Sequence, residues 1–122
     1  KDFQQLFLIK QMVKELKLPI EIVAAPLIRE LDGLAMSSRN VRLDDAGRKS
    51  ALIISKSLTE NSIAQMHQVL ATEPGFKLDY LEIIDEDTFL PATTDSKNKR
   101  AIIAGWVNGV RLLDNKRMGA TA

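Results

Sequence analysis

The sequence predicts an α/β segment followed by a small α+β domain, in which helices pack on a roughly three-stranded antiparallel sheet. A helical pattern over residues 2–17 is followed by a short β-rich run, and a helix leading into a strand is half of an α/β unit. After residue 44, helical patterns come first and strand patterns follow, which is the order of an α+β layer pair. Asn108-Gly109 lies between two apolar runs, a pattern typical of a β-hairpin.

The first helix is predicted from apolar residues at steps of three and four, which are Phe3, Leu6, Ile9, Val13 and Leu16. Leu8 and Met12 widen this apolar stripe, so we expect the helix to be well buried. Asp2 fits the N-cap position, with Gln5 as a capping-box partner. Pro19 ends the helical region, and the run IEIVAAP at residues 20–26 predicts a short buried strand.

The second part of the chain is expected to begin near residue 44. Either Asp44 or Asp45 can cap a helix that extends to about Leu58, and the polar residues 59–62 interrupt it. A second helix follows and is expected to end before Glu73.

Three strands complete the predicted fold. Apolar residues between Leu78 and Ile84 indicate the first strand, and residues 91–100 read as a polar loop. The runs AIIAGWV and VRLLD flank Asn108-Gly109 and predict the last two strands, because a type I′ turn needs positive φ at both central residues.

Composition narrows the classes of function. The 122 residues include 17 basic and 16 acidic side chains, a balance that gives no electrostatic case for nucleic-acid or membrane-surface binding. The chain has no cysteine, which excludes disulfides and thiolate metal sites and favours a cytoplasmic setting. His67 is the single histidine, so a histidine-based metal site is not expected.

The stretch GLAMSSRN at residues 33–40 is a candidate anion site. The hydroxyls of Ser37 and Ser38, the Arg39 guanidinium and the loop N–H groups suit phosphate oxygens through charge-assisted hydrogen bonds. The alternative is an ordinary serine-rich turn with Arg39 in a surface ion pair. The pattern alone leaves both open.

The N-terminal residues are a second candidate. Lys1 and Asp2 stand at the start of a predicted helix, where free N–H groups attract anions and Lys1 adds a charge. The alternative is an exposed lysine beside a purely structural cap. The Gln5 amide either returns to the cap or points into a pocket.

Three stretches together resemble the pantoate–β-alanine ligase family. They are KDFQQL at residues 1–6, IEIVAAPLIRELDGLAMSSRN at residues 20–40 and RLLDN at residues 111–115. Their order and spacing match the later half of that family. The resemblance is close over about residues 1–43 and returns at residues 78–115.

The resemblance implies an architecture and a reaction. Residues 1–36 would be the last helix and strand of a Rossmann-like nucleotidyltransferase domain with an ATP loop at 36–40, and residues 41–122 a C-terminal lid domain. The family condenses pantoate and β-alanine to pantothenate in coenzyme A biosynthesis. It uses ATP, forms pantoyl adenylate as intermediate, and releases AMP and diphosphate.

The resemblance also assigns roles to residues. Ser37, Ser38 and Lys1 are the expected catalytic residues, because they hold the ATP phosphates with support from Arg39. Gln5 is expected to bind pantoate. Asp2 would meet the ribose, and the adenine would be bordered by Ile28 and Met36. No metal ligand is expected in this chain, since the Mg²⁺ that accompanies ATP would be held by the family's N-terminal half.

Expectations about the whole molecule follow from the same resemblance. We expect a fragment of weak or no ligase activity, with residues absent near 59–66. Its partners would be pantoate, β-alanine and ATP, with no nucleic acid or membrane, and the full-length family is commonly a homodimer. Two alternatives remain: a non-catalytic α+β interaction module, and an ATP-binding piece of another adenylate-forming enzyme.

Overall fold

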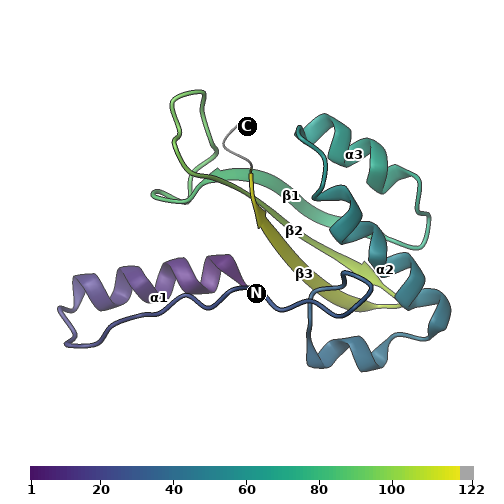
Figure 1. Ribbon diagram of the computed structural model, residues 1–122, viewed down its shortest axis with the longest axis horizontal. Helices are drawn as coiled ribbons and strands as arrows, with labels where there is room; N and C mark the ends of the chain where they lie inside the picture. The colour runs from purple at the N-terminus through teal and green to yellow at the C-terminus, as the bar shows by residue number, and fades with distance from the viewer. Residues whose placement is uncertain (119–122) are drawn as a thin grey trace.

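The computed structural model describes residues 1–118 and contains one three-stranded sheet. The strands are β1 (Lys77–Asp85), β2 (Lys99–Val107) and β3 (Val110–Arg117), in the order β1-β2-β3 with both pairs antiparallel (Figure 1). The predicted antiparallel sheet is confirmed. The polar loop before β2 is two residues shorter than predicted, because Lys99 already pairs with Asp85.

The hairpin between β2 and β3 has the predicted turn. Asn108 and Gly109 have φ values of 54° and 72°, and Val107 pairs with Val110. Positive φ at both positions gives the turn the twist of the flanking strands, so it fixes the register of β2 against β3.

Two helices lie against the sheet, as predicted. They are α2 (Asp45–Ser57) and α3 (Ile63–Ala71) (Figure 1). Of the two candidate caps, Asp44 is the N-cap of α2: its Oδ1 accepts hydrogen bonds from the Gly47 N–H at 2.6 Å and the Asn108 side chain at 3.0 Å. The cap therefore also ties α2 to the hairpin turn.

The hydrophobic core lies between these helices and the sheet. Ile54 of α2, Met66 of α3, and Ile103 and Val107 of β2 are among its most deeply buried side chains. Leu34, from the long connection before α2, joins the same cluster with 3% of its surface exposed. The core thus fixes one point of the connection that carries the candidate anion loop.

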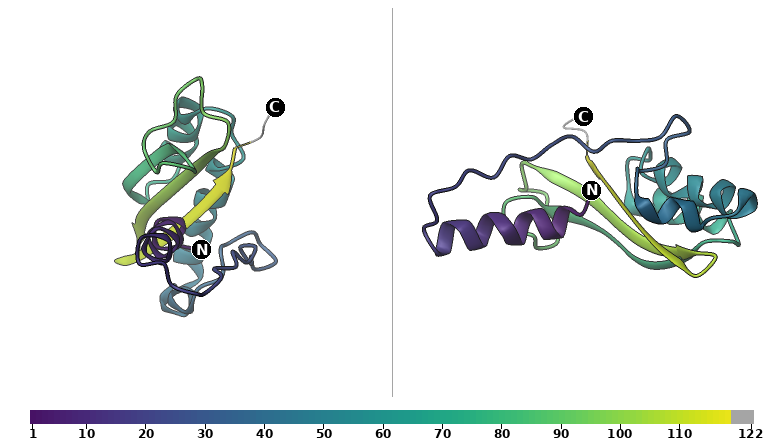
Figure 2. Two further views of the ribbon diagram at one scale, coloured as in Figure 1. Left: turned by 90° about the vertical axis from the view of Figure 1, so that its left-hand side faces the viewer. Right: turned by 90° about the horizontal axis from the view of Figure 1, so that it is seen from below.

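The prediction that the first helix is well buried is wrong. The helix α1 (Phe3–Glu15) forms, but it has no buried residue, and Leu8 and Leu16 are 54% and 63% exposed. It projects away from the sheet, with its start near β3 (Figures 1 and 2). Its first turns contact Phe89 of the β1–β2 loop, whereas Leu8, Met12 and Leu16 of its apolar stripe stay exposed.

The predicted strand at residues 20–26 is also absent from residues 1–118 as the structure describes them. The segment is extended and runs back alongside α1 (Figure 2), but Val23 and Ile20 are 77% and 55% exposed. A strand needs a neighbouring strand to accept and donate its main-chain hydrogen bonds, and this part of the chain supplies none. The prediction of a buried strand at residues 20–26 is therefore wrong for residues 1–118.

None of the helices in residues 1–118 is long and apolar enough to cross a membrane.

Two glycines allow a test of the sheet. A Cβ at Gly105 would lie 2.2 Å from Phe76 Cζ and 2.7 Å from the Lys77 carbonyl oxygen, whereas a Cβ at Gly109 meets nothing within 4 Å. We expect Gly105→Ala to lower the free energy of unfolding by about 1–3 kcal/mol through overpacking. Gly109→Ala should cost roughly 1 kcal/mol, through positive φ alone. Urea unfolding of both variants measures the difference, and equal costs would contradict this account of the sheet.

Candidate functional site

The candidate loop is positioned by a short antiparallel turn at residues 28–36. The Met36 N–H donates to the Ile28 carbonyl at 2.9 Å, and the Glu30 N–H donates to the Leu34 carbonyl at 2.8 Å. Gly33 has a φ of 95°, a conformation that side chains disfavour, and it lets the chain reverse. Leu34 and Ala35, 3% and 2% exposed, bury the far limb of the turn.

This turn brings Ile28 and Met36 together. Both residues are exposed, at 66% and 52%. Within residues 1–118 the Ile28 N–H and the Met36 carbonyl make no main-chain hydrogen bond, which leaves one donor and one acceptor without a main-chain partner at the open end of the turn. A main-chain N–H and a main-chain carbonyl of this kind can form hydrogen bonds with the edge of a planar heterocycle.

Ion pairs with α2 hold the turn in place. The Arg48 guanidinium of α2 donates to Glu30 at 2.6 Å and to Asp32 at 3.0 Å. Burial alone would raise the pKa of Asp32, but hydrogen bonds from the Leu34 N–H and Arg48 hold that pKa below its usual value. Glu30 and Asp32 are therefore partners of an arginine, as expected for side chains with no acid–base role.

Asn40 anchors the other end of the loop. Its side chain is buried, and its Nδ2 donates to Glu30 Oε2 and to the Ala35 carbonyl, each at 3.1 Å. One amide thus joins the loop, the turn and the arginine network. The asparagine of MSSRN has a structural place, although sequence reasoning gave it no role.

The hydroxyl residues open a short 3₁₀ helix, η1 (Ser38–Arg42). Ser37 is its N-cap, and its Oγ accepts a hydrogen bond from the Arg39 N–H at 3.2 Å. Ser38 and Arg39 are exposed, and the Arg39 guanidinium donates to the Arg111 carbonyl at 3.2 Å. The Arg39 cation therefore rests on a main-chain oxygen of β3, and no carboxylate within residues 1–118 forms an ion pair with it.

The N-terminal pair lies farther along β3, where the Asn115 side chain donates to the Lys1 carbonyl. Asp2 is the N-cap of α1, as predicted, and its Oδ1 accepts from the Gln5 N–H at 3.0 Å. Partial burial lowers the pKa of the Lys1 ammonium, and the Arg39 cation lowers it further, while Asp114 opposes both. The Arg39 cation thus lies near enough to disfavour the charged form of Lys1, although the two residues are far apart in sequence.

A hollow of about 620 Å³ opens between α1 and the extended segment beside it. Lys1, Asp2 and Gln5 line one wall, and the apolar residues 23–27 line the other. Gln5 is exposed and its side-chain amide borders this space. A polar group on one wall and alkyl groups on the other suit a small, branched, polar molecule.

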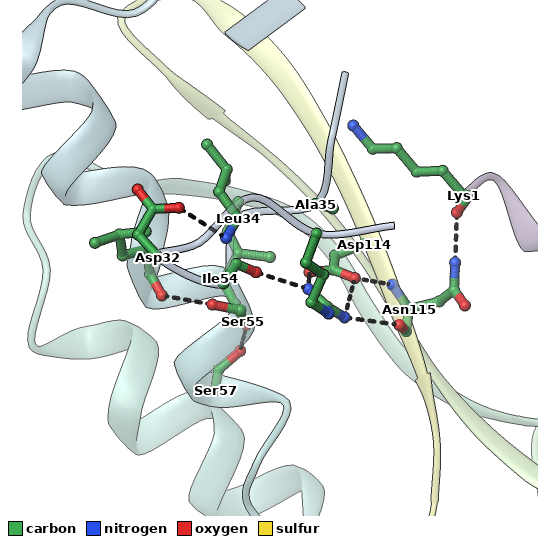
Figure 3. Close-up of polar contacts among 12 residues, drawn as sticks. Lys1, Asp32, Leu34, Ala35, Ile54, Ser55, Ser57, Asp114 and Asn115 are labelled. Atoms are coloured by element: carbon green, nitrogen blue, oxygen red, sulfur yellow. Dashed lines mark hydrogen bonds and ion pairs between the residues drawn. The ribbon is translucent and has the colours of Figure 1, made fainter. Parts of the chain in front are cut away.

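Sequence analysis gave no individual role to three residues near this site, Arg29, Asp114 and Asn115. Arg29, in the turn, makes a bidentate ion pair with the buried Asp114 of β3, with N–O distances of 2.7 and 2.9 Å. Asn115 donates from its side chain to the Lys1 carbonyl (Figure 3). The motif RLLDN was the available signal, but its spacing did not say what its last two residues touch.

Within residues 1–118 no cluster of three or more histidine, cysteine or acidic side chains could hold a metal ion.

Comparison with known proteins identifies the family. The model of the pantoate–β-alanine ligase family matches residues 1–117, almost the whole chain. The chain belongs to the pantoate–β-alanine ligase family. The match covers both candidate segments, the N-terminal pair and the serine loop, so the two lie within one family pattern.

Curated relatives are named pantothenate synthetase. Those from Geobacter sp. strain M21 and Thermoanaerobacter sp. strain X514 are 41% and 44% identical to this chain, each over 98% of the chain and 47% of the relative. The chain spans about half the length of the curated relatives it matches. The Geobacter alignment has 132 positions, more than the 122 residues present, so that relative has residues with no counterpart in this chain.

Solved structures of proteins with these names match the fold of this chain. Pantothenate synthetase from Thermus thermophilus superimposes with a TM-score of 0.91 at 37% identity, over 97% of this chain and 47% of that one. The ligase from Francisella tularensis, solved in complex with "Beta-gamma ATP and Beta-alanine", gives 0.72 at 28% identity, over 97% of this chain and 41% of that one.

The anchoring of the loop can be tested at Asn40. Asn40→Ala removes two buried hydrogen bonds, so we expect a loss of about 1–3 kcal/mol in unfolding free energy. Amides of residues 36–40 should also exchange faster. Asn98→Ala, at an exposed asparagine of the β1–β2 loop, is the matched control. Equal exchange in both variants would contradict the anchoring role.

Proposed function

We propose that this chain is the ATP-loop and lid portion of a pantoate–β-alanine ligase. Together with the rest of the enzyme it condenses pantoate and β-alanine to pantothenate at the expense of ATP. The observation that carries the proposal is that one family pattern spans residues 1–117 and includes both the N-terminal pair and the serine loop. We also propose a cytoplasmic setting, in keeping with a chain that has no cysteine.

The phosphate groups of ATP are the ligands that suit the loop. Lys1 supplies an ammonium, Arg39 a guanidinium, and Ser37 and Ser38 supply hydroxyls. The Arg39 cation lowers the pKa of the Lys1 ammonium, and an anion bound between these two groups would remove that repulsion. The triphosphate tail of ATP fits this need, and the Francisella tularensis relative was solved with an ATP-type ligand.

The remaining roles follow from the same placement. The Ile28 N–H and the Met36 carbonyl, which make no main-chain hydrogen bond within residues 1–118, suit the adenine edge. Asp2 uses Oδ1 for the cap of α1, which leaves Oδ2 for the ribose hydroxyls. Gln5, on the wall of the hollow, would donate its amide to the pantoate carboxylate or hydroxyl.

The reaction has two steps, and the described residues act mainly in the first. A pantoate carboxylate oxygen bonds to the α-phosphorus of ATP, the bond from that phosphorus to the bridging oxygen breaks, and diphosphate leaves. Charge grows on diphosphate, and Lys1, Ser38 and Arg39 stabilise it without moving. In the second step the β-alanine amine attacks the acyl carbon, AMP leaves, and the nitrogen gives up a proton.

Residues 1–118 contain no group of three or more histidine, cysteine or acidic side chains that could hold the Mg²⁺ that accompanies ATP. We propose that its ligands lie in the part of the enzyme outside this chain, and that no residue described here coordinates it.

The domain boundary is part of the proposal. Residues 1–36 would complete a nucleotide-binding domain, and residues 41–122 form the lid. The exposed apolar stripe of α1 and the unpaired segment 20–26 support this division, since both need a neighbouring sheet that this chain lacks. The lid, in contrast, has its own core between α2, α3 and the sheet.

Titration of the chain with ATP separates this proposal from a non-catalytic interaction module. Because the loop is preformed by the turn and Asn40, ATP with Mg²⁺ should shift the amide resonances of Met36, Ser37 and Ser38. An unchanged loop at millimolar ATP, with shifts only elsewhere, would favour the interaction module.

Activity tests the phosphate role. We propose a chimera in which this chain replaces the matching segment of the Thermus thermophilus enzyme, which shares its fold closely. Ser38→Ala in the chimera should lower pantoyl-adenylate formation roughly 10²-fold by removing one phosphate donor. Its unfolding free energy should change by less than about 0.5 kcal/mol, because the side chain is exposed.

Two controls accompany this assay. Ser96→Ala, at a serine of the β1–β2 loop, should leave the rate unchanged. The chain by itself should form pantothenate weakly or not at all. Unaltered adenylation by the Ser38→Ala chimera would refute the assigned role.

A further inference from the structure

The site depends on two segments that make no hydrogen bond with each other among residues 1–118. One is the start of α1, with Lys1 and Asp2, and the other is the serine loop at 36–39. Both must present their charged groups to one ligand at fixed separation. Something else in the fold has to set that separation, because small misplacements of catalytic groups are costly.

Both segments are tied to one dipeptide at the end of β3. Asp114 and Asn115 are 3% and 6% exposed, and they are two of the four buried polar or charged residues among those described. They lie beside Lys1 and below the turn that leads to the loop (Figure 3). Figure 3 also shows the Asn115 side chain directed toward Lys1 and Asp114 lying near Ala35 of the turn.

Asp114 holds the loop side. Its two oxygens accept from both terminal nitrogens of Arg29, and the same guanidinium donates to the Gly33 carbonyl at 3.0 Å. Arg29 therefore joins the strand to Gly33, where the chain reverses. From Gly33 the chain continues through Leu34 and Ala35 into Met36 and the serines. Planar, bidentate pairing fixes direction as well as distance.

Asn115 holds the α1 side. Its Nδ2 donates to the Lys1 carbonyl, and its Oδ1 accepts from Arg100 of β2 at 2.7 Å. Arg100 is itself held by Glu86 at 2.8 Å and stacks over the Phe3 ring at 4.6 Å. The asparagine amide is thus locked in orientation at both ends, and it fixes the main chain from which the Lys1 side chain extends.

We propose that Asp114 and Asn115 are positioning residues of the ATP site, which set the separation between Lys1 and the Ser37–Ser38–Arg39 loop from one rigid strand. This inference rests on the proposed function. Neither residue touches ATP in this account; each acts through another residue. The buried Asp114 carboxylate also lies close enough to the Lys1 ammonium to oppose the loss of its proton.

A stabilising role alone does not explain the arrangement. A buried ion pair contributes little net stability, because the desolvation of both charges offsets their attraction, and apolar replacements are often as stable. What the pair supplies is a fixed geometry between a loop and a strand. That geometry matters where two charged segments must meet one ligand.

The test uses the chimera with Asp114→Asn, Asp114→Glu and Asn115→Ala. Asp114→Asn keeps the shape but loses the charge that binds Arg29, so we expect the KM for ATP to rise about tenfold or more, with a smaller change in the KM for β-alanine. Asp114→Glu, which restores the charge, should recover part of the loss. Asn115→Ala, which frees only the Lys1 side, should raise the KM for ATP independently.

Gly109→Ala is the matched control for stability. It weakens the same strand at its other end, in a turn that contacts neither segment. A merely structural role for Asp114 would give both variants the same pattern: a lower active fraction and an unchanged KM for ATP. That result would overturn the inference.

Hydrogen exchange on the chain itself separates this inference from the proposed function. In Asp114→Asn the amides of residues 36–39 should exchange faster, and in Asn115→Ala those at the start of α1 should, while β2 keeps its protection in both. If the wild-type chimera is inactive, the proposed function fails and exchange alone decides the positioning role. If the chimera is active but exchange at both segments is unchanged in the variants, the positioning role fails and the function stands.

Discussion

The bidentate ion pair between Arg29 and Asp114 is the contact on which the site depends. The long connection at residues 18–36 is held in two ways. Leu34 and Ala35 are buried, and Arg29 forms the ion pair with Asp114 of β3. A buried carboxylate is costly without a partner, and the guanidinium satisfies both oxygens at once. The turn, the serine loop and η1 therefore take their place from a strand more than 70 residues away in sequence.

Positive charge lies along β3, with Lys1 beside Asn115 and Arg39 beside Arg111. Burial lowers the pKa of the Lys1 ammonium, and the Arg39 cation lowers it further. The Arg111 carbonyl accepts a hydrogen bond from Arg39, and the Arg111 guanidinium forms an ion pair with Asp79 at 2.8 Å. A site with like charges held near each other by the fold is poised for an anion, since binding relieves the repulsion that folding created.

The two halves of the chain differ in how far they satisfy their own apolar surface. The lid buries Ile54, Met66 and Ile103 almost completely, so its helices and sheet form one core. The N-terminal arm leaves Leu16 and Val23 more than half exposed. This contrast agrees with a chain that spans about half the length of the curated relatives it matches. Arg29 and Lys1 of the N-terminal arm are held by polar contacts to Asp114 and Asn115 of β3.

The sequence by itself predicted most local elements: the cap at Asp2, the helices α2 and α3, the three strands and the Asn108-Gly109 turn, because each depends on neighbours a few residues apart. It left the α2 cap open between Asp44 and Asp45 and did not predict η1. It also indicated a site of hydroxyls and cations at Lys1 and Ser37–Arg39, and the family that carries it. Only the tertiary structure decided that α1 is exposed and that residues 20–26 form no strand, since pairing and burial depend on partners that periodicity cannot show. Only the structure joined Asp114 and Asn115 to Arg29 and Lys1, because hydrogen bonds across more than 80 residues leave no spacing to read.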